Sequence, residues 1–331
     1  MHRFASGLFS LLLIILTALA GSVWWLERWL DRPGPLSGPA IATLEPGTGV
    51  RSIAVQLADL EAIDNPYLFV LAAAMGRNHR LLKAGEYEFP KKAKPRTILR
   101  ILTSGETLVH KLTVPEGLTR SDVMELIENT TALSGKVETL PVEGSLLPET
   151  YHFSRGENRN DLIARMEIAM QATIHDLWGK RRADLPYGSP TEALIMASIV
   201  EKETGLESER ARVAAVFVNR LKLEMPLQSD PTVLYSLTKG AEHLGRPLTR
   251  SDLKYASPYN TYLHTGLPPG AIANPGRSSI IAALNPDDSD ELYFVADGHG
   301  GHRFARTLRA HNRNVATFRR ARANVGECGK C

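Results

Sequence analysis

The segment from Ser189 to Gly205, SPTEALIMASIVEKETG, predicts a helix with almost no polar face that ends in two glutamates. Ser189 suits the N-cap, Pro190 suits the first helical position, and Glu192 completes a Ser-x-x-Glu capping box. Gly205 predicts a left-handed stop to the helix. Because the residues between these signals are nearly all apolar, we expect the fold to enclose this helix rather than leave it on a surface.

The two glutamates at the end of this helix, Glu201 and Glu203, are two residues apart. At roughly 100° of rotation per residue they point in nearly opposite directions, so only one of them faces any given cavity. Burial and the negative end of the helix dipole both disfavour an ionised carboxylate, which makes a raised pKa and a general-acid role reasonable for the enclosed one. A pair of surface glutamates that solvates the helix end is the alternative, and this segment alone does not decide between them.

The amino-terminal region predicts a membrane helix. No charged residue occurs from Phe4 to Leu26, which is long enough for a span of roughly 20 apolar residues. Three tryptophans lie at one end of this run, as in an interfacial belt: Trp24, Trp25 and Trp29. Arg3 at the other end predicts a cytoplasmic amino terminus. Residues 18–20, ALA, resemble a signal-peptide cleavage site, but the apolar run continues beyond them, which favours a retained anchor.

Composition limits the function classes. The net charge of +3 argues against a dedicated nucleic-acid binder. The only cysteines, Cys328 and Cys331, supply two thiols where a structural zinc site needs four ligands, so we interpret them as a tail feature, open to oxidation outside the cytoplasm. We expect no metal and no cofactor.

The chain divides into five predicted segments of an α+β protein. Residues 1–30 form the cytoplasmic amino terminus and the transmembrane helix, and the proline- and glycine-rich residues 31–39 form a linker. Short strands and helices alternate in a small module, which with its connecting segment spans residues 40–140. Residues 141–318 form a larger mixed helix and strand domain, and residues 319–331 form a basic tail.

Polar and aromatic side chains gather in the glycine- and proline-punctuated loops of the larger domain. A glycan cleft needs such groups for sugar hydroxyls, acetamido groups and sugar faces, together with a carboxyl group for the leaving oxygen. Taken singly, each candidate is explained better by pinning of its own loop. The candidates are Glu143, Gln228, Ser229, Asp230, Tyr259, Asn260 and Tyr262.

Several long motifs, in the same order along the chain, resemble the YceG-like family of endolytic murein transglycosylases. They are residues 197–204 (ASIVEKET), 143–151, 228–233 (QSDPTV), 259–262 (YNTY) with 266–270, and 293–302 with His311-Asn312. The resemblance implies a single membrane helix, a small LysM-like α+β module and a catalytic domain on the periplasmic side of the cell inner membrane. By position it implies Glu201 as the catalytic residue, and Glu203 is the second candidate. The terminal Cys-x-x-Cys is outside the family pattern.

The activity implied by this resemblance is internal cleavage of nascent peptidoglycan glycan strands, which ends their elongation, in association with peptidoglycan synthases. We expect a lyase reaction at the bond between N-acetylmuramic acid and N-acetylglucosamine, in which one glutamate acts as acid and then as base and leaves a 1,6-anhydro end. Two alternatives stay open. One is a hydrolytic muramidase with a second carboxylate such as Asp230. The other is a non-catalytic, membrane-anchored peptidoglycan-binding scaffold.

Overall fold

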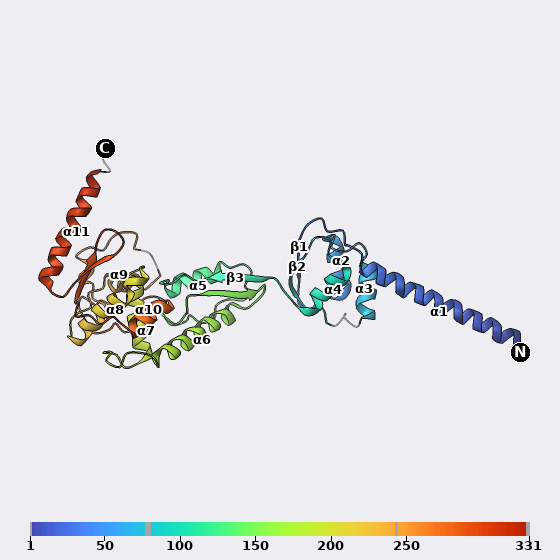
Figure 1. Ribbon diagram of the computed structural model, residues 1–331, viewed down its shortest axis with the longest axis horizontal. Helices are drawn as coiled ribbons and strands as arrows, with labels where there is room; N and C mark the ends of the chain where they lie inside the picture. Colours follow the sequence, from blue (N-terminus) through green and yellow to red (C-terminus); the bar gives the residue numbers. More distant parts are fainter. Residues whose placement is uncertain (1, 77–80, 242–243, 329–331) are drawn as a thin grey trace. The chain divides into compact units, whose positions relative to one another are not determined.

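The computed structural model describes residues 2–76, 81–241 and 244–328, which form two compact units (Figure 1). Residues 1–110 and 152–156 form the small unit, and residues 111–151 and 157–331 form the larger one. Residues 111–140, which the sequence analysis grouped with the small module, therefore lie in the larger unit. The architecture is α+β, with helices predominating and three two-stranded sheets among the described residues.

The small unit packs short helices against one antiparallel strand pair. Its elements are α1 (His2–Leu30), β1 (Ala40–Leu44), α2 (Val50–Asp59), α3 (Pro66–Met75), β2 (Gly85–Phe89) and α4 (Pro95–Ser104). Strands β1 and β2 pair antiparallel, with Ala40 opposite Phe89. Asn65 caps α3, since its side-chain oxygen accepts the N–H groups of Tyr67 and Leu68 at 3.0 and 3.1 Å.

Helix α1 runs without a break into the core of the small unit. Residues 9–30 are long and apolar enough to cross a membrane, which agrees with the predicted anchor. Leu26, Trp29 and Leu30 at its end are buried in the core of the unit. The indole N–H of Trp29 also donates to Asp64 Oδ1 at 2.8 Å. The end of the apolar helix is thus part of a folded unit.

The larger unit surrounds helix α7 with other helices. Its elements are β3 (Val109–Thr113), α5 (Arg120–Glu128), β4 (Thr150–Ser154), α6 (Arg159–Trp178), α7 (Pro190–Glu203), α8 (Glu207–Lys222), α9 (Asp230–Thr238), a short 3₁₀ turn (Asp252–Lys254), α10 (Arg277–Leu284), β5 (Tyr293–Ala296), β6 (His302–Ala305) and α11 (Leu308–Cys328). Strands β3 and β4 pair with each other, and residues 109–110 of β3 and 152–154 of β4 belong to the small unit. Strands β5 and β6 form an antiparallel hairpin, with Tyr293 opposite Ala305. The predicted basic tail is helical through Cys328, and Cys331, with the question of a disulfide, lies outside the described residues.

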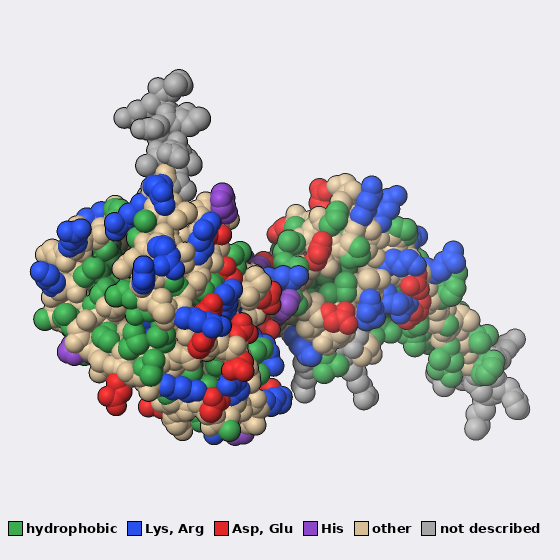
Figure 2. Space-filling view, turned by 60° about the vertical axis from the view of Figure 1, so that its left-hand side comes forward, with side chains coloured by type: hydrophobic (Ala, Val, Ile, Leu, Met, Phe, Trp, Pro, Cys, Tyr) green, Lys and Arg blue, Asp and Glu red, His purple; other side chains and the backbone are tan. Residues whose placement is uncertain are grey.

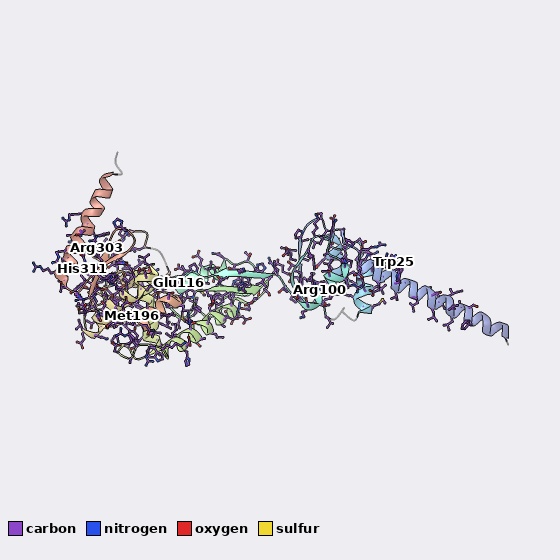
Figure 3. All side chains as sticks on the ribbon, viewed as in Figure 1. Trp25, Arg100, Glu116, Met196, Arg303 and His311 are labelled. Carbon is purple, nitrogen blue, oxygen red and sulfur yellow. The ribbon has the colours of Figure 1, made fainter. Side chains whose placement is uncertain are left out.

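Helix α7 is enclosed, as its sequence predicts. Met196, Ile199 and Val200 are inaccessible to solvent, and Met196 lies inside the larger unit in Figure 3. Helices α8 and α10 cover it. The carboxylate of Glu192 accepts the N–H of Gly188, rather than that of the N-cap, at 2.7 Å, so only half of the predicted capping box forms.

The predicted left-handed stop at Gly205 is wrong. Helix α7 ends at Glu203, and Thr204 already has extended backbone angles, with φ at −142°. Its N–H still donates to the carbonyl of Val200 at 3.3 Å, which closes the last turn. The Thr204 hydroxyl then accepts the N–H of Leu206 at 3.1 Å and forms the turn toward α8. A side-chain turn thus does what the glycine was expected to do.

The burial of α7 predicts a large stability difference between two isoleucines. Ile199→Ala should destabilise the protein by about 2–5 kcal/mol, because it leaves a cavity in a close-packed core. The matched control is Ile168→Ala on α6, where the isoleucine is 64% exposed, and it should cost less than about 1 kcal/mol. Chemical denaturation followed by circular dichroism measures both, and equal losses would contradict the enclosed position of α7.

Candidate active site

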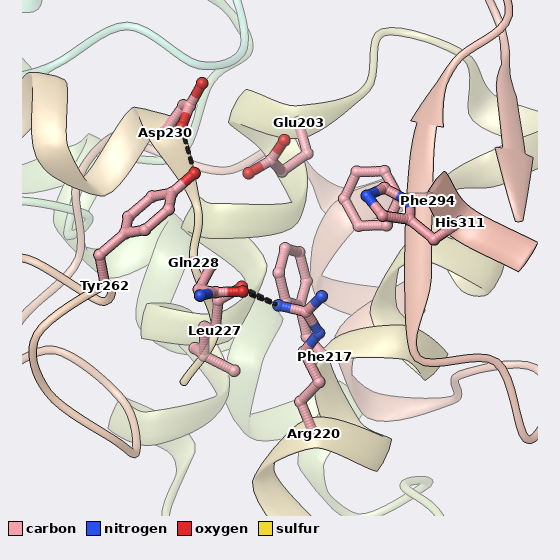
Figure 4. A pocket seen from close by; sticks show the side chains of 9 residues that line it. All are labelled: Glu203, Phe217, Arg220, Leu227, Gln228, Asp230, Tyr262, Phe294 and His311. Carbon is pink, nitrogen blue, oxygen red and sulfur yellow. Dashed lines mark hydrogen bonds between the residues drawn. The ribbon is translucent and has the colours of Figure 1, made fainter. Parts of the chain in front are cut away.

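A polar cavity of about 250 Å³ opens at the carboxyl-terminal end of α7 (Figure 4). Its walls come from α7, α8, α9, β5, α11 and the loops before and after α9. The lining residues are Glu203, Phe217, Arg220, Leu227, Gln228, Asp230, Tyr262, Phe294 and His311. Figure 4 shows Asp230 and Tyr262 on one side of Glu203, and Phe294 and His311 on the other. One carboxyl group at the end of a buried helix therefore faces amide, phenol, guanidinium, imidazole and carboxylate groups.

Glu203 is held in this cavity by a hydroxyl group. Ser229 Oγ donates to Glu203 Oε1 at 2.5 Å, and the Ser229 N–H in turn donates to Thr261 Oγ1 at 3.0 Å. Burial raises the pKa of Glu203 to about 7, and the negative charge of Asp230 adds to the rise. The Ser229 bond and the positive charge of Arg220 act in the opposite direction without cancelling it. Near neutral pH both protonation states of Glu203 are populated.

Tyr262 and Asp230 form a second hydrogen-bonded pair in the cavity. The Tyr262 hydroxyl donates to Asp230 Oδ1 at 2.6 Å. Burial, together with this bond, raises the pKa of the Tyr262 hydroxyl, so it stays a donor at neutral pH. The Tyr262 hydroxyl therefore orients the Asp230 carboxylate beside Glu203.

Gln228 reaches the cavity from a constrained backbone position. Its φ of 53° lies in the left-handed region, which is costly for a residue with a side chain. The Gln228 N–H donates to the carbonyl of Thr261 at 3.1 Å, which holds this conformation. Its side-chain oxygen accepts a long bond from Arg220 at 3.4 Å. The strain lies next to Ser229, the partner of Glu203.

Arg220 brings a buried positive charge to the cavity floor. Its Nε donates to the Leu292 carbonyl at 2.7 Å and its Nη1 to the Leu227 carbonyl at 2.8 Å. Its guanidinium also lies over the Tyr293 ring, 5.2 Å from the centroid. Burial lowers the pKa of Arg220, yet a guanidinium remains charged at neutral pH. The Arg220 guanidinium donates to backbone carbonyls rather than to Glu203. Its positive charge therefore offsets only part of the rise in the Glu203 pKa.

His311 on α11 adds a neutral imidazole to the cavity wall. Its ring stacks on Tyr293 at 5.3 Å between centroids. Burial and the nearby Arg220 lower the pKa of His311, which favours the neutral ring at pH 7. Its Nδ1 is buried, and no group in the described part of the chain hydrogen-bonds to it. The sequence alone does not point to Arg220 or His311 as site residues, although His311 is in one of the quoted motifs.

Glu201 points away from the Glu203 cavity. Its Oε1 accepts from Arg210 Nη2 at 3.3 Å and its Oε2 accepts the N–H of Gly276 at 2.9 Å. The same Arg210 nitrogen donates to Glu116 at 3.1 Å. A Cβ at Gly276 would collide with the Glu116 carboxylate in its present position, so a larger residue there would displace that side chain. Glu201 therefore joins α7, α8 and two loops, and the predicted divergence of the two glutamates is confirmed.

Glu143 lies at a different place in the larger unit. Its carboxylate accepts the N–H of Arg120 at 2.7 Å and the hydroxyl of Tyr235 at 3.3 Å. Burial raises the pKa of Glu143. Tyr259 packs beside the same Tyr235, with ring centroids 4.9 Å apart. Neither Glu143 nor Tyr259 lines the Glu203 cavity.

Asn260 pins its own loop. It is fully buried, and its amide donates to the carbonyls of Leu253 and Tyr255 at 3.1 and 2.8 Å. Its side-chain oxygen accepts the N–H of Tyr262 at 3.0 Å. The described contacts give Asn260 a structural role that orients Tyr262.

The raised pKa of Glu203 predicts that removing its charge stabilises the protein at alkaline pH. A carboxyl group with a higher pKa in the folded state contributes stability below about pH 4.5, and this stability is lost as the pH rises through about 7. Glu203→Gln should therefore raise the unfolding free energy by about 1–3 kcal/mol at pH 8, and by less at pH 5. Thermal melts at both pH values test this. The control Glu201→Gln, which breaks an ion pair, should not stabilise at either pH.

Three comparisons identify relatives of the chain. The profile of the YceG-like family matches residues 42–317. An endolytic murein transglycosylase of Bacillus subtilis (strain 168) is 36% identical over 262 residues, which are 70% of this chain and 71% of that protein. One of Streptococcus pneumoniae serotype 2 (strain D39) is 29% identical over 322 residues, covering 84% of this chain and 58% of that protein.

A solved structure has the same fold. The crystal structure of a yceG-like protein from Listeria monocytogenes covers 83% of this chain and 98% of its own, with a TM-score of 0.53 and 31% identity. The family profile extends from β1 into α11 and so includes every residue of the Glu203 cavity. The chain belongs to the YceG-like family.

Proposed function

We propose that this protein is an endolytic murein transglycosylase that cleaves peptidoglycan glycan strands internally. Its relatives in Bacillus subtilis and Streptococcus pneumoniae carry that name. The observation that carries the proposal is one partly buried carboxyl group, Glu203, whose pKa is raised to about 7 in a polar cavity. Cleavage that forms a 1,6-anhydro sugar needs only one carboxyl group, because the nucleophile is the C6 hydroxyl of the substrate itself.

We assign the acid and base role to Glu203 rather than to Glu201. Glu201 pairs with Arg210 and accepts the backbone N–H of Gly276, so each of its two oxygens already has a donor away from the Glu203 cavity. Glu203 has no ion pair among the described residues, and burial favours its protonated form. A general acid must hold a proton before the reaction, so the geometry supports the second glutamate of the pair.

In the proposed reaction, protonated Glu203 donates its proton to the oxygen that joins N-acetylmuramic acid to N-acetylglucosamine. The C1–oxygen bond breaks as positive charge develops at C1 of the muramic sugar. The Glu203 carboxylate then takes the proton of the C6 hydroxyl of the same sugar, whose oxygen bonds to C1. The products are a 1,6-anhydro end and a free hydroxyl on the leaving sugar, and Glu203 is protonated again.

The other cavity residues fit substrate-binding roles. The negative charge of Asp230 raises the Glu203 pKa, and in the proposed reaction it stabilises the positive charge that develops at C1 of the bound muramic sugar. Gln228, Arg220 and His311 offer amide, guanidinium and imidazole groups for sugar hydroxyls and acetamido groups. Phe217 and Phe294 supply an apolar wall, and their rings meet edge to face with the centroids 5.7 Å apart. Glu143 and Tyr259 lie outside this cavity, and a role for them would require a more extended glycan site.

The alternatives make different products. A hydrolytic muramidase would use Asp230 to activate water or to form a covalent intermediate, and it would leave reducing ends. A binding scaffold would leave the strands intact. Ser229 and Asp230 tune a titratable group in a cavity, which a scaffold does not require, so the site favours an enzyme.

The placement of the chain in the cell is also a proposal. The apolar length of α1 supports a single membrane span, and Arg3 supports a cytoplasmic amino terminus, with the larger unit on the periplasmic side of the inner membrane. The family resemblance supports a LysM-like role for the small unit and association with peptidoglycan synthases. It also supports a function as terminator of strand elongation.

Exchange of each glutamate tests the assignment. Glu203→Gln should lower the rate of strand cleavage by at least about 100-fold, since a general acid contributes about 10²–10⁴. Glu201→Gln keeps an acceptor for the Gly276 N–H and should retain activity within about tenfold of the parent. Mass spectrometry of products from uncrosslinked glycan strands should show internal fragments with 1,6-anhydro ends. An inactive, folded Glu201→Gln beside an active Glu203→Gln would reverse the assignment, and reducing ends would establish a hydrolase.

The pH dependence tests the protonation state. Because the acid form of Glu203 starts the reaction, kcat/KM should fall tenfold per unit as the pH rises above about 7. Asp230→Asn removes a charge that raises this pKa, so the fall should begin at lower pH in that variant. Steady-state rates across pH 5–9 measure both profiles. Loss of all activity in Asp230→Asn, with the fold intact, would point instead to the hydrolytic alternative.

A further inference from the structure

A second cavity, of about 530 Å³, lies in the small unit at the base of α1. It is formed by the end of α1, the end of α3 and the middle of α4. The lining residues are Leu26, Glu27, Leu30, Ala72, Met75, Gly76, Arg96, Leu99, Arg100 and Thr103. We call it the juxtamembrane groove. It combines an apolar floor with a charged rim, and the polar cavity around Glu203 does not share this pattern.

The rim of the groove carries unbalanced positive charge. Arg96 bonds to both carboxylates at the end of α1, Asp31 at 3.0 Å and Glu27. Lys94 lies close enough to Asp31 to help lower the pKa of its carboxyl group. Arg100, one turn after Arg96 on α4, is exposed and has no ion pair within the described ranges. Figure 2 shows Lys and Arg side chains on the small unit near the point where the apolar helix leaves it.

The groove lies at the depth of lipid headgroups if α1 crosses a membrane. Trp24 and Trp25 are exposed on α1 where it leaves the unit, and Trp25 is labelled there in Figure 3. At about 1.5 Å per residue, Leu26 and Leu30 lie about 3–9 Å beyond Trp24 along the helix. The headgroup layer on each side of a bilayer is about 5–8 Å thick. The apolar floor therefore begins where acyl chains end.

Helix α3 extends the apolar surface away from the groove. Tyr67, Leu71 and Met75, spaced by four residues, are 84%, 48% and 53% exposed. Met75 also lines the groove, so this exposed apolar face of α3 is continuous with the groove. Helix α3 packs against α1 and lies beside its end in Figure 1. An exposed apolar helix face beside a membrane helix is typical of an interfacial segment.

We propose that the juxtamembrane groove binds an anionic phospholipid of the membrane in which α1 is anchored. The first acyl carbons would lie against Leu26, Leu30 and Met75, and the phosphate would pair with Arg100. A zwitterionic headgroup would leave the excess positive charge of the rim without a partner, so the groove should prefer a net negative lipid. The bound lipid would hold the small unit on the membrane surface. This inference rests on the proposed membrane span and not on the transglycosylase activity.

Native mass spectrometry of the full-length, delipidated protein in detergent tests the proposal. The probe is an equimolar mixture of phosphatidylglycerol and phosphatidylcholine. The parent protein should retain phosphatidylglycerol several-fold over phosphatidylcholine. Arg100→Gln should lower this retention about fivefold, the factor that corresponds to about 1 kcal/mol for a basic residue near an anionic surface. Arg51→Gln, an exposed arginine on α2 outside the groove, is the matched control and should leave the retention unchanged.

Each other result overturns the proposal. Equal losses in Arg100→Gln and Arg51→Gln would mean that lipid binds by overall charge. Equal retention of the two lipids would remove the role of the rim. Displacement of the lipid by millimolar glycerol phosphate would identify a soluble phosphate ligand in place of a lipid. Because no glycan is present, Glu203→Gln should bind lipid like the parent, which separates this test from that of the enzyme.

Discussion

The candidate active site depends on one partly buried carboxyl group, Glu203, that has no ion pair among the described residues. Arg210 and Arg220 lie near the two glutamates, and the fold lets only Arg210 form a direct ion pair with one of them. Arg210 pairs directly with Glu201, whereas backbone carbonyls hold Arg220, and Glu203 accepts its hydrogen bond from the hydroxyl of Ser229. A direct ion pair would keep Glu203 ionised, and full exposure to water would return its pKa to the ordinary range of a glutamate.

Removing the Glu203 carboxyl group from water costs folding free energy. The surrounding residues must therefore be held rigidly, because any relaxation would let water reach the group. Residues 195–200 of helix α7 are buried, so the turn that precedes Glu203 is fixed by close packing in the core. Opposite it, the strained backbone of Gln228 and the buried Ser229 are both held by Thr261. Strain and desolvation thus meet at one cavity, where hydrogen bonds on both sides restrict any relaxation.

The sequence predicts the local parts of this site better than their assembly. The enclosed α7, the divergence of its glutamates and the cavity positions of Gln228, Asp230 and Tyr262 follow from periodicity and loop composition. The partners of Glu201 come from residues 116, 210 and 276, whose meeting depends on tertiary packing. For the same reason the sequence does not point to Arg220 and His311, which line the cavity. Loop composition does suggest Asn260, but its contacts are with its own loop.

A pKa near 7 also explains how one residue can serve two steps. A stronger acid would donate its proton readily but would be a poor base toward the C6 hydroxyl. A weaker acid would be a good base toward that hydroxyl but would donate its proton less readily. Near pH 7 the two forms of Glu203 differ little in free energy, so neither step requires the less stable form at much cost. Asp230 and Ser229 shift this balance in opposite directions, and the joint position of both beside Glu203 is therefore part of the chemistry.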